Sequence, residues 1–312
     1  MSAGSGDGPA PAPSAPPAVF VVGAGVVGTT LATSLWAAGV PVLGLHGRRT
    51  AAASAPTVAA GGAGVITTSG DLPEVVSRAD VIILCVRDDR IGQVAERLRR
   101  EARLRDHHIL LHTSGAHAAT EVLGAARPAV RAVGTMHPLV SFADPGLFAA
   151  GLRDVAFGVE GDPPARAAAR ILVGELGGRA LDLAAGDLPL YHAGAVLASN
   201  YVVALADLAR GLLIAAGVPP EDALPALVPL MSSVVQNLAK VGLPGALTGP
   251  VERGDVSTVE RHLGALEGRA PSLAPLYRSM GREVLRIALD KSSLDAEAIA
   301  RLGALFGEGA PG

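Results

Sequence analysis

The chain has few of the residues on which several classes of protein depend. Its one cysteine, Cys85, excludes a disulfide framework or a cluster of thiolate metal ligands within a single chain, and a lone thiol suits a reducing cytoplasm. Aromatic residues make up 3% of the sequence and the formal net charge is -3, so no overall positive charge is available to hold a nucleic-acid backbone. We therefore expect a cytoplasmic protein that does not bind nucleic acid.

Signals for export or membrane insertion are also scarce. Residues 1–17 are almost wholly Ala, Gly, Ser and Pro, a composition that predicts a disordered tail and not a signal peptide. The most apolar long segment, 193–216, contains Asn200, Asp207 and Arg210, which are costly in lipid but tolerated in a helix buried between domains or subunits. We expect no membrane partner, and we expect this helix to bury its apolar surface in a homodimer.

Hydrophobic residues, by contrast, make up 49% of the chain and charged residues 18%, which is typical of a well-buried α/β protein. From residue 18 to 184, short apolar runs alternate with helical patterns, as in βαβ units with a parallel sheet. The predicted strands are 19–22, 41–45, 81–86, 108–112, 132–135, 155–159 and 179–183, with helices at 26–38, 92–103 and 165–176. From 185 to 312 the pattern predicts an all-α domain with helices at 187–216, 224–241, 256–267, 274–288 and 294–306.

A Gly-x-Gly-x-x-Gly motif follows the first predicted strand directly and opens a helix. The turn consists of Gly23, Ala24, Gly25, Val26, Val27 and Gly28. In such motifs the first glycine permits a tight turn, the second lets the backbone approach a pyrophosphate, and the third lets the helix pack closely on the strand. The start of the helix then offers free N–H groups to the phosphates. We therefore predict a dinucleotide-binding Rossmann domain with a doubly wound parallel sheet at 18–184, followed by an all-α domain for substrate binding and dimerisation at 185–312.

The end of the second predicted strand indicates which dinucleotide is bound. NAD sites usually place Asp or Glu there, about 20 residues past the glycines, to accept hydrogen bonds from the ribose. This sequence has no carboxylate at that point and instead has Arg48 and Arg49. Because guanidinium groups pair well with a 2′-phosphate, we predict NADP(H) as the cofactor.

Two further strand ends point to the same edge of the sheet. Val86 ends the third predicted strand and is a candidate for cofactor binding, whereas we interpret Asp88 or Asp89 as the cap of the next helix. Thr113 and Ser114 follow the fourth predicted strand, where they could contact the nicotinamide or the substrate. Capping of a helix explains Ser114 equally well.

Several segments together carry a resemblance to one family. They are 23–49, Thr113-Ser114-Gly115, Gly134-Thr135-Met136-His137-Pro138-Leu139, Tyr191-His192 through Asn200-Tyr201, and 247–255. The chain resembles the bacterial family that joins a Rossmann-like domain to a C-terminal helical domain of unknown function, some members of which act as an alternative ketopantoate reductase in pantothenate biosynthesis. It is more distantly similar to pyrroline-5-carboxylate reductases, prephenate dehydrogenases and the 6-phosphogluconate dehydrogenase-like superfamily. The resemblance implies the fold strongly and the substrate weakly.

Candidate proton donors follow from where the chain departs from that superfamily. Related reductases often place Lys one turn before an Asn on the first long helix of the second domain. Aligning Asn200 with that Asn puts Val196 at the Lys position. His192, two turns earlier on the same predicted helix, is the natural substitute, because an imidazole with a pKa near ~6.5 can deliver a proton at neutral pH. His137, which resembles the His-Pro segment of prephenate dehydrogenases, and Lys240 are the alternatives, and a purely structural role explains either histidine as well.

A Gly- and Pro-containing loop at 248–255 is the candidate for substrate binding. Arg253 could hold a carboxylate, with Thr248 as a further donor and Asp255 orienting the guanidinium. Alternatively, Arg253 and Asp255 form a surface pair that ties the loop together. The remaining histidines lack the partners that would make a metal site, so we predict no metal.

Three hypotheses for function remain open at this point. The first is an NADPH-dependent oxidoreductase that reduces a small 2-keto acid, with ketopantoate, which gives pantoate, as the best candidate. The second is a reductase of imines of the pyrroline-5-carboxylate type, or a prephenate-type dehydrogenase. The third is a sensor or scaffold that binds NADP(H) without turnover.

Overall fold

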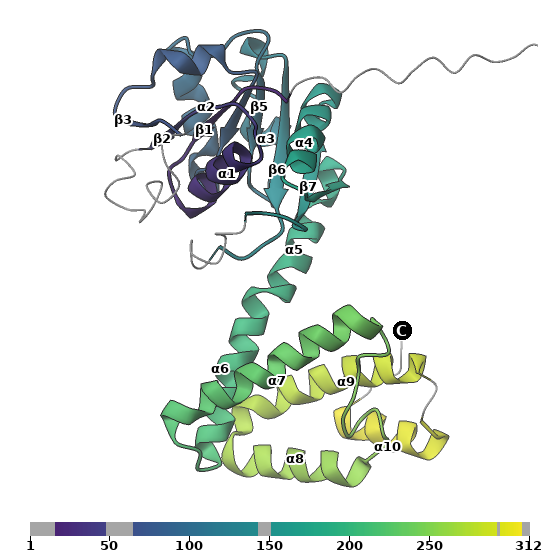
Figure 1. The fold of residues 1–312 in the computed structure, drawn as a ribbon. Coiled ribbons are helices and arrows are strands. Elements are labelled where there is room, and N and C mark those ends of the chain that lie inside the picture. The colour runs from purple at the N-terminus through teal and green to yellow at the C-terminus, as the bar shows by residue number, and fades with distance from the viewer. Residues whose placement is uncertain (1–15, 48–64, 143–150, 292–293, 308–312) are drawn as a thin grey trace, which may run out of the picture. The chain divides into compact units, whose positions relative to one another are not determined.

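The computed structural model describes residues 16–47, 65–142, 151–291 and 294–307. The chain divides into two compact units, residues 1–199 and 200–312. The boundary therefore lies between Ser199 and Asn200, whereas composition placed it between residues 184 and 185. The difference is the helix at 188–198, labelled α5 in Figure 1, which falls within residues 1–199 of the N-terminal unit.

The N-terminal unit is built on one eight-stranded sheet with the order β3-β2-β1-β4-β5-β6-β7-β8. The strands are β1 Val19–Val22, β2 Val42–Gly47, β3 Thr67–Ser69, β4 Val81–Leu84, β5 Ile109–His112, β6 Ala132–Pro138, β7 Ala156–Gly161 and β8 Arg179–Asp182. Each predicted strand overlaps one of these, and the α/β fold is confirmed. The sheet is not wholly parallel, however: β7 pairs with β6 in the antiparallel direction, and β8 runs parallel to β7. The three-residue strand β3 was not predicted.

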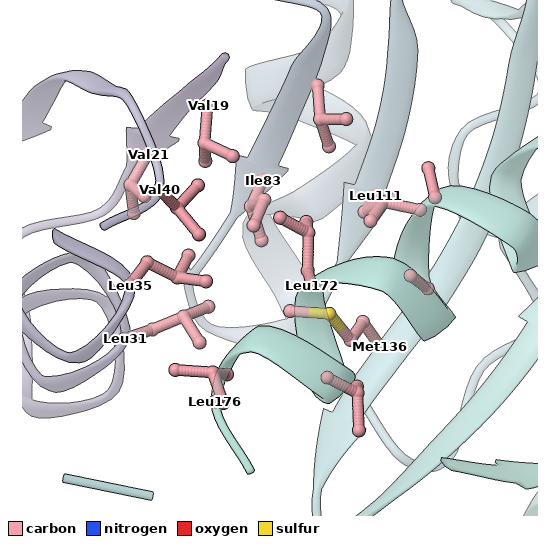
Figure 2. Packing of buried hydrophobic residues seen from close by; sticks show 14 of the residues in the cluster. Val19, Val21, Leu31, Leu35, Val40, Ile83, Leu111, Met136, Leu172 and Leu176 are labelled. Carbon is pink, nitrogen blue, oxygen red and sulfur yellow. The ribbon is translucent and has the colours of Figure 1, made fainter. Parts of the chain in front are cut away.

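Helices cover both faces of the sheet. They are α1 Val26–Ala37, α2 Ile91–Arg100, the short α3 Ala119–Val122 and α4 Pro163–Glu175. On one face, Leu31 and Leu35 of α1 and Leu172 of α4 pack against strand residues such as Ile83 and Met136 (Figure 2). A second buried cluster, with residues from α2 and α3, covers the other face. Successive residues of each central strand supply opposite faces, which explains why these strands are apolar throughout.

Instead of the single helix predicted at 187–216, the chain forms two helices. These are α5 Leu188–Ala198 and α6 Asn200–Ala215, and they meet at Ser199, whose φ of -127° and ψ of -77° are not helical. His192 and Asn200 therefore lie on two successive helices, whereas the sequence predicted one continuous helix for both.

The second unit is all-helical, as predicted. After α6 it contains α7 Pro220–Val241, α8 Val256–Arg269, α9 Ala274–Asp290 and α10 Ala296–Phe306. Its small core is formed by residues of α8, α9 and α10, among them Val259, Leu285 and Phe306. Large apolar side chains of α6 and α7 are exposed, Val203 at 71% and Val235 at 65%. By length and composition alone, the segments 185–215 and 220–241 could each cross a membrane, which is weak evidence because core helices of soluble proteins share these properties.

Candidate functional site

The glycine turn lies at the carboxyl end of β1, between its neighbours β2 and β4. Gly23 has a φ of +119°, and a Cβ built on it would lie 2.1 Å from the carbonyl oxygen of Cys85. A Cβ on Gly28 would lie 1.8 Å from the carbonyl oxygen of Gly23. Both positions therefore require glycine if α1 is to pack closely against β1 and β4, as the motif predicts.

Gly25 differs from the other two glycines because the space beside it is open. Apart from its own neighbours in the chain, no atom of the described residues lies within 4 Å of the position that its Cβ would take. Gly25 is also the N-cap of α1, and no side chain caps this helix. Open access to the backbone at an uncapped helix N-terminus is what a pyrophosphate requires. The residues present therefore fit a dinucleotide at this turn.

Neighbouring apolar residues support the turn. Ala24 and Val27 are partly buried against the cluster under α1, and Val86 packs on the cluster of the opposite face. The Cγ1 atom of Val86 lies 3.1 Å from the position of a Cβ on Gly23. Val86 thus borders the glycine turn, where the sequence placed it as a candidate for cofactor contact.

The end of β2 is polar but carries no carboxylate. The ring of His46 is buried, and its Nδ1 lies 2.9 Å from the hydroxyl oxygen of Thr68. The backbone carbonyl oxygen of His46 accepts a hydrogen bond from the N–H of Gly23 at 2.7 Å. Burial and the nearby positive charge of Arg97 lower the pKa of His46. Arg48 and Arg49, predicted to bind the 2′-phosphate, lie outside the described residues, so that contact remains a prediction.

The turn after β5 is held from several sides. The hydroxyl of Ser114 donates to Oδ2 of Asp88 at 2.9 Å and accepts from the N–H of Ala116 at 3.3 Å. Thr113 is bound to β4, because its N–H donates to the carbonyl oxygen of Leu84 at 3.2 Å. Ser114 does not cap a helix, since α3 has Ala118 at its N-cap. The capping interpretation of Ser114 is therefore wrong, and its hydroxyl lies at the carboxyl edge of the sheet.

Asp88 was also misassigned as a helix cap. The N-cap of α2 is Arg90 and no side chain caps that helix, while Asp88 lies in a short 3₁₀ turn before it. Asp89 pairs with the flanking Arg87 at 3.1 Å and Arg90 at 3.6 Å. Asp88 instead receives the Ser114 hydroxyl, a contact between residues 26 positions apart that sequence periodicity does not reveal.

His137 and His192, the two histidines predicted to compete as proton donors, lie close together. Their ring centroids are 6.0 Å apart, with His137 on β6 and His192 on α5. The ring of His137 also lies over Gly115, where an added Cβ would come within 2.8 Å of it. Burial lowers the pKa of His137 to about 4, with His192 adding to the decrease and the carboxylate of Asp88 opposing it. His137 is therefore neutral at pH 7.

Tyr191 is a candidate that the sequence analysis did not assign. Its hydroxyl oxygen lies 3.0 Å from Nδ1 of His137, and the two rings meet edge to face with centroids 5.6 Å apart. Burial raises the pKa of Tyr191, and a backbone hydrogen bond with Gly158 opposes the increase. The sequence offered one signal for Tyr191, because it directly precedes the candidate His192. A partly buried tyrosine also needs a polar partner for its hydroxyl.

The predicted substrate loop belongs to the second unit. Asp255 caps α8: it accepts hydrogen bonds from the N–H of Thr258 at 3.1 Å and from the hydroxyls of Ser257 at 3.0 Å and Thr258 at 2.6 Å. The exposed Arg253 makes no hydrogen bond or ion pair with any residue that the structure describes. Asp255 therefore does not orient Arg253 as expected, and the guanidinium is available to a ligand. Thr248 is exposed in the same loop.

The contacts of Lys240 and Lys291 do not support a role as proton donor for either residue. Lys291 donates to the carbonyl oxygen of Leu247 at 3.0 Å and pairs with Glu252 at 2.9 Å, so it fixes the loop. Lys240 is exposed in the last turn of α7. Across the described ranges, no three His, Cys, Asp or Glu residues are grouped as metal ligands would be.

Comparison with known families agrees with this geometry. Residues 18–114 match the family described as NADP oxidoreductase, coenzyme F420-dependent. The chain is an NADP-dependent oxidoreductase. Residues 155–284 of the oxidoreductase match a domain of unknown function, DUF2520, so the resemblance to a Rossmann-like family with such a C-terminal domain is confirmed. No curated protein matches the chain in sequence.

Solved structures share the fold of the oxidoreductase over most of its length. A protein from Thermotoga maritima is 24% identical with a TM-score of 0.66, covering 88% of this chain and 99% of its own. An NADP oxidoreductase from Bacteroides fragilis is 21% identical with a TM-score of 0.63, covering 86% and 97%. Pyrroline carboxylate reductase from Plasmodium falciparum, with NADP bound, is 14% identical with a TM-score of 0.56, covering 93% and 98%. At these identities the likeness shows the fold alone.

Proposed function

We propose that the oxidoreductase transfers hydride from NADPH to the carbon of a C=N bond in a small carboxylic acid, such as the cyclic imine pyrroline-5-carboxylate. The arrangement around His137 carries this proposal: its Nδ1 lies 3.0 Å from the Tyr191 hydroxyl oxygen, and with a pKa of about 4 the ring carries no second proton to donate at pH 7. An imine that arrives protonated needs no further proton, whereas a ketone does. The likeness in fold to a pyrroline carboxylate reductase supports the same choice.

Reduction of a 2-keto acid, with ketopantoate as the best candidate, is the second proposal. His192 favours it, because this half-buried imidazole lies beside His137 and could deliver a proton to the oxygen that forms. Oxidation of the prephenate type is less well supported. It would use His137 as a base, and a pKa of about 4 makes His137 a weak one.

In either reduction NADPH supplies the hydride, and the chain's own residues position the reactants. The backbone from Gly23 to Gly28 binds the pyrophosphate, and the turn at Ser114 receives the nicotinamide. In the second unit, the role of Arg253 in binding a carboxylate through paired hydrogen bonds, with Thr248 as a further donor, stays a prediction from the sequence. The role of Asn200 in positioning the acid likewise stays a prediction from the sequence.

Consumption of NADPH with pyrroline-5-carboxylate and with ketopantoate tests the proposal. We expect the imine to have a kcat/KM at least about tenfold higher, because ketone reduction depends on a proton donor. His192→Ala should lower ketone reduction by about a hundredfold and leave imine reduction within a few fold. A preference for ketopantoate that disappears in this variant would favour the second proposal, and NADPH binding without turnover of any substrate would favour a sensor.

We also propose that the oxidoreductase is a cytoplasmic homodimer and not a membrane protein. Its fold is that of soluble Rossmann-type reductases, and α6 carries the ion pair Asp207–Arg210 at 2.8 Å. Exposed apolar residues of α6 and α7 supply the surface that a second copy would cover. Light scattering on protein purified without detergent tests this, since a monomer or a requirement for detergent would contradict it.

A further inference from the structure

His112, the last residue of β5, is fully buried and has partners at both ring nitrogens. Its side chain is 0% exposed. Nδ1 accepts a hydrogen bond from the backbone N–H of Ser114 at 3.1 Å, and Nε2 lies 3.0 Å from the hydroxyl oxygen of Thr135. A buried polar ring in which both nitrogens are bonded has a specified orientation. Neither cofactor binding nor metal binding accounts for it.

The partners also determine which nitrogen carries the proton. Since Nδ1 accepts from an amide, the proton of the neutral ring is on Nε2, which donates to Thr135. The hydroxyl of Thr135 in turn donates to Oε2 of Glu160 at 3.1 Å, and that oxygen also accepts from the N–H of Ala119 at 2.9 Å. The chain of donors thus ends at the buried carboxyl group of Glu160. The opposite tautomer would place two N–H groups against each other at Ser114.

Protonation would disturb the same contact, and the surroundings oppose it. Burial lowers the pKa of His112 to about 3, and the nearby His117 and His137 act in the same direction. At neutral pH the ring is therefore an acceptor toward Ser114.

The turn that His112 holds carries three features of the candidate site. The Ser114 hydroxyl binds Asp88, Gly115 lies against the ring of His137, and Thr113 is bound to β4. We propose that His112 is a positioning residue: its fixed tautomer sets the turn 113–115 so that the nicotinamide end of NADPH is held at the reactive geometry. The proposal rests on the placement of the nicotinamide at Ser114 in the proposed function.

Variants of His112 separate positioning from general stability. His112→Asn keeps an acceptor near the position of Nδ1, whereas His112→Phe fills the space without one. His108→Phe is the matched control, because His108 is also 0% exposed and also accepts an N–H bond at Nδ1, from Arg105 at 2.9 Å, but it precedes the other end of β5. Each variant is compared with wild type for its melting temperature, its kcat at saturating NADPH and the fluorescence of bound nicotinamide.

We expect His112→Phe to lower kcat by about tenfold, the effect of losing one buried hydrogen bond, and to lower the fluorescence of bound nicotinamide. The KM for NADPH should change by less than about threefold, because the pyrophosphate contacts remain. His112→Asn should recover most of both signals, and His108→Phe should change neither. If His112→Phe does not fold, Thr135→Val tests the same tautomer, since it removes the acceptor for Nε2–H.

Equal losses in His112→Phe and His108→Phe, in proportion to their melting temperatures, would overturn the proposal. So would a wild-type fluorescence signal in a folded His112→Phe variant. The fluorescence measurement needs no substrate, so it still decides the role of His112 if neither imine nor ketone is reduced.

Discussion

Acidification from pH 7 to pH 5 should destabilise the N-terminal unit through histidines that are neutral when buried. His108 is 0% exposed, and burial with nearby positive charge lowers its pKa to about 4. In the unfolded chain its pKa returns to about 6.5, so the unfolded state binds more protons between these values. The stability that the neutral ring maintains is complete above pH 6.5 and is lost as the pH falls toward 4.

The magnitude follows from the two pKa values. Between pH 7 and pH 5, protonation of one such histidine in the unfolded state alone lowers the free energy of unfolding by about 2 kcal/mol. Replacing His108 with Asn removes this linkage, so the variant should lose about 2 kcal/mol less than wild type over the same interval. His262 is exposed and belongs to the second unit, so His262→Asn serves as the control substitution.

Unfolding by urea at both pH values measures the effect. The single tryptophan, Trp36, lies in α1, so its fluorescence reports on the N-terminal unit. Carboxylates also titrate in this interval, but they do so in all three proteins and cancel in the comparison. If His108→Asn loses as much stability between pH 7 and pH 5 as wild type and His262→Asn do, then burial does not keep the ring of His108 neutral, and the same reasoning fails for His137.

Three further outcomes are expected. Gly25→Ala should fold normally but weaken NADPH binding by about tenfold in a fluorescence titration. Gly28→Ala should instead lower the melting temperature, because its Cβ would overlap a carbonyl oxygen. Equal effects of the two variants would refute the assignment of Gly25 to the pyrophosphate site. Tyr191→Phe should lower kcat by about tenfold with little change in melting temperature, since it frees His137 to turn; unchanged kcat would remove Tyr191 from the site. Lys291→Met should destabilise the second unit by about 1–3 kcal/mol in urea unfolding, because its loop contacts are partly buried, and a change within error would contradict this.

The sequence predicted the parts of the fold that depend on local patterns. Strands such as β1 and β4 are buried on both faces, so their sequences are short apolar runs. The glycine motif marks the turn after β1. The direction of β7 was not predictable in this way, because an antiparallel pair with β6 depends on which strands meet in space. The break between α5 and α6 at Ser199 contains neither glycine nor proline, so the helical periodicity of the sequence continues across it and did not predict the break.

The candidate site followed the same division. The glycine turn was predicted because the spacing of its three glycines is visible in the local sequence, although the atom that excludes a Cβ from Gly23 belongs to Cys85, just after β4. The contact of Asp88 with Ser114 joins positions 26 residues apart, and that of Tyr191 with His137 joins positions 54 residues apart. Each of these side chains also has an ordinary explanation in its local sequence. Such pairs become recognisable only when the carboxyl ends of β4, β5 and β6 are brought to one edge.

Neutral histidines at this edge have an electrostatic consequence for the proposed reaction. The nicotinamide ring acquires a positive charge as hydride leaves it, and a protonated imidazole nearby would oppose that charge. Burial at the ends of parallel strands keeps His112 and His137 neutral, while the carboxylate of Asp88 is held at Ser114. The same arrangement favours a protonated imine over the alkoxide that a ketone would form. A positive charge at this edge would stabilise the oxyanion of a ketone more strongly than neutral donors do, and among the described residues around the turn 113–115, no lysine or arginine bonds to Ser114, His137 or Tyr191.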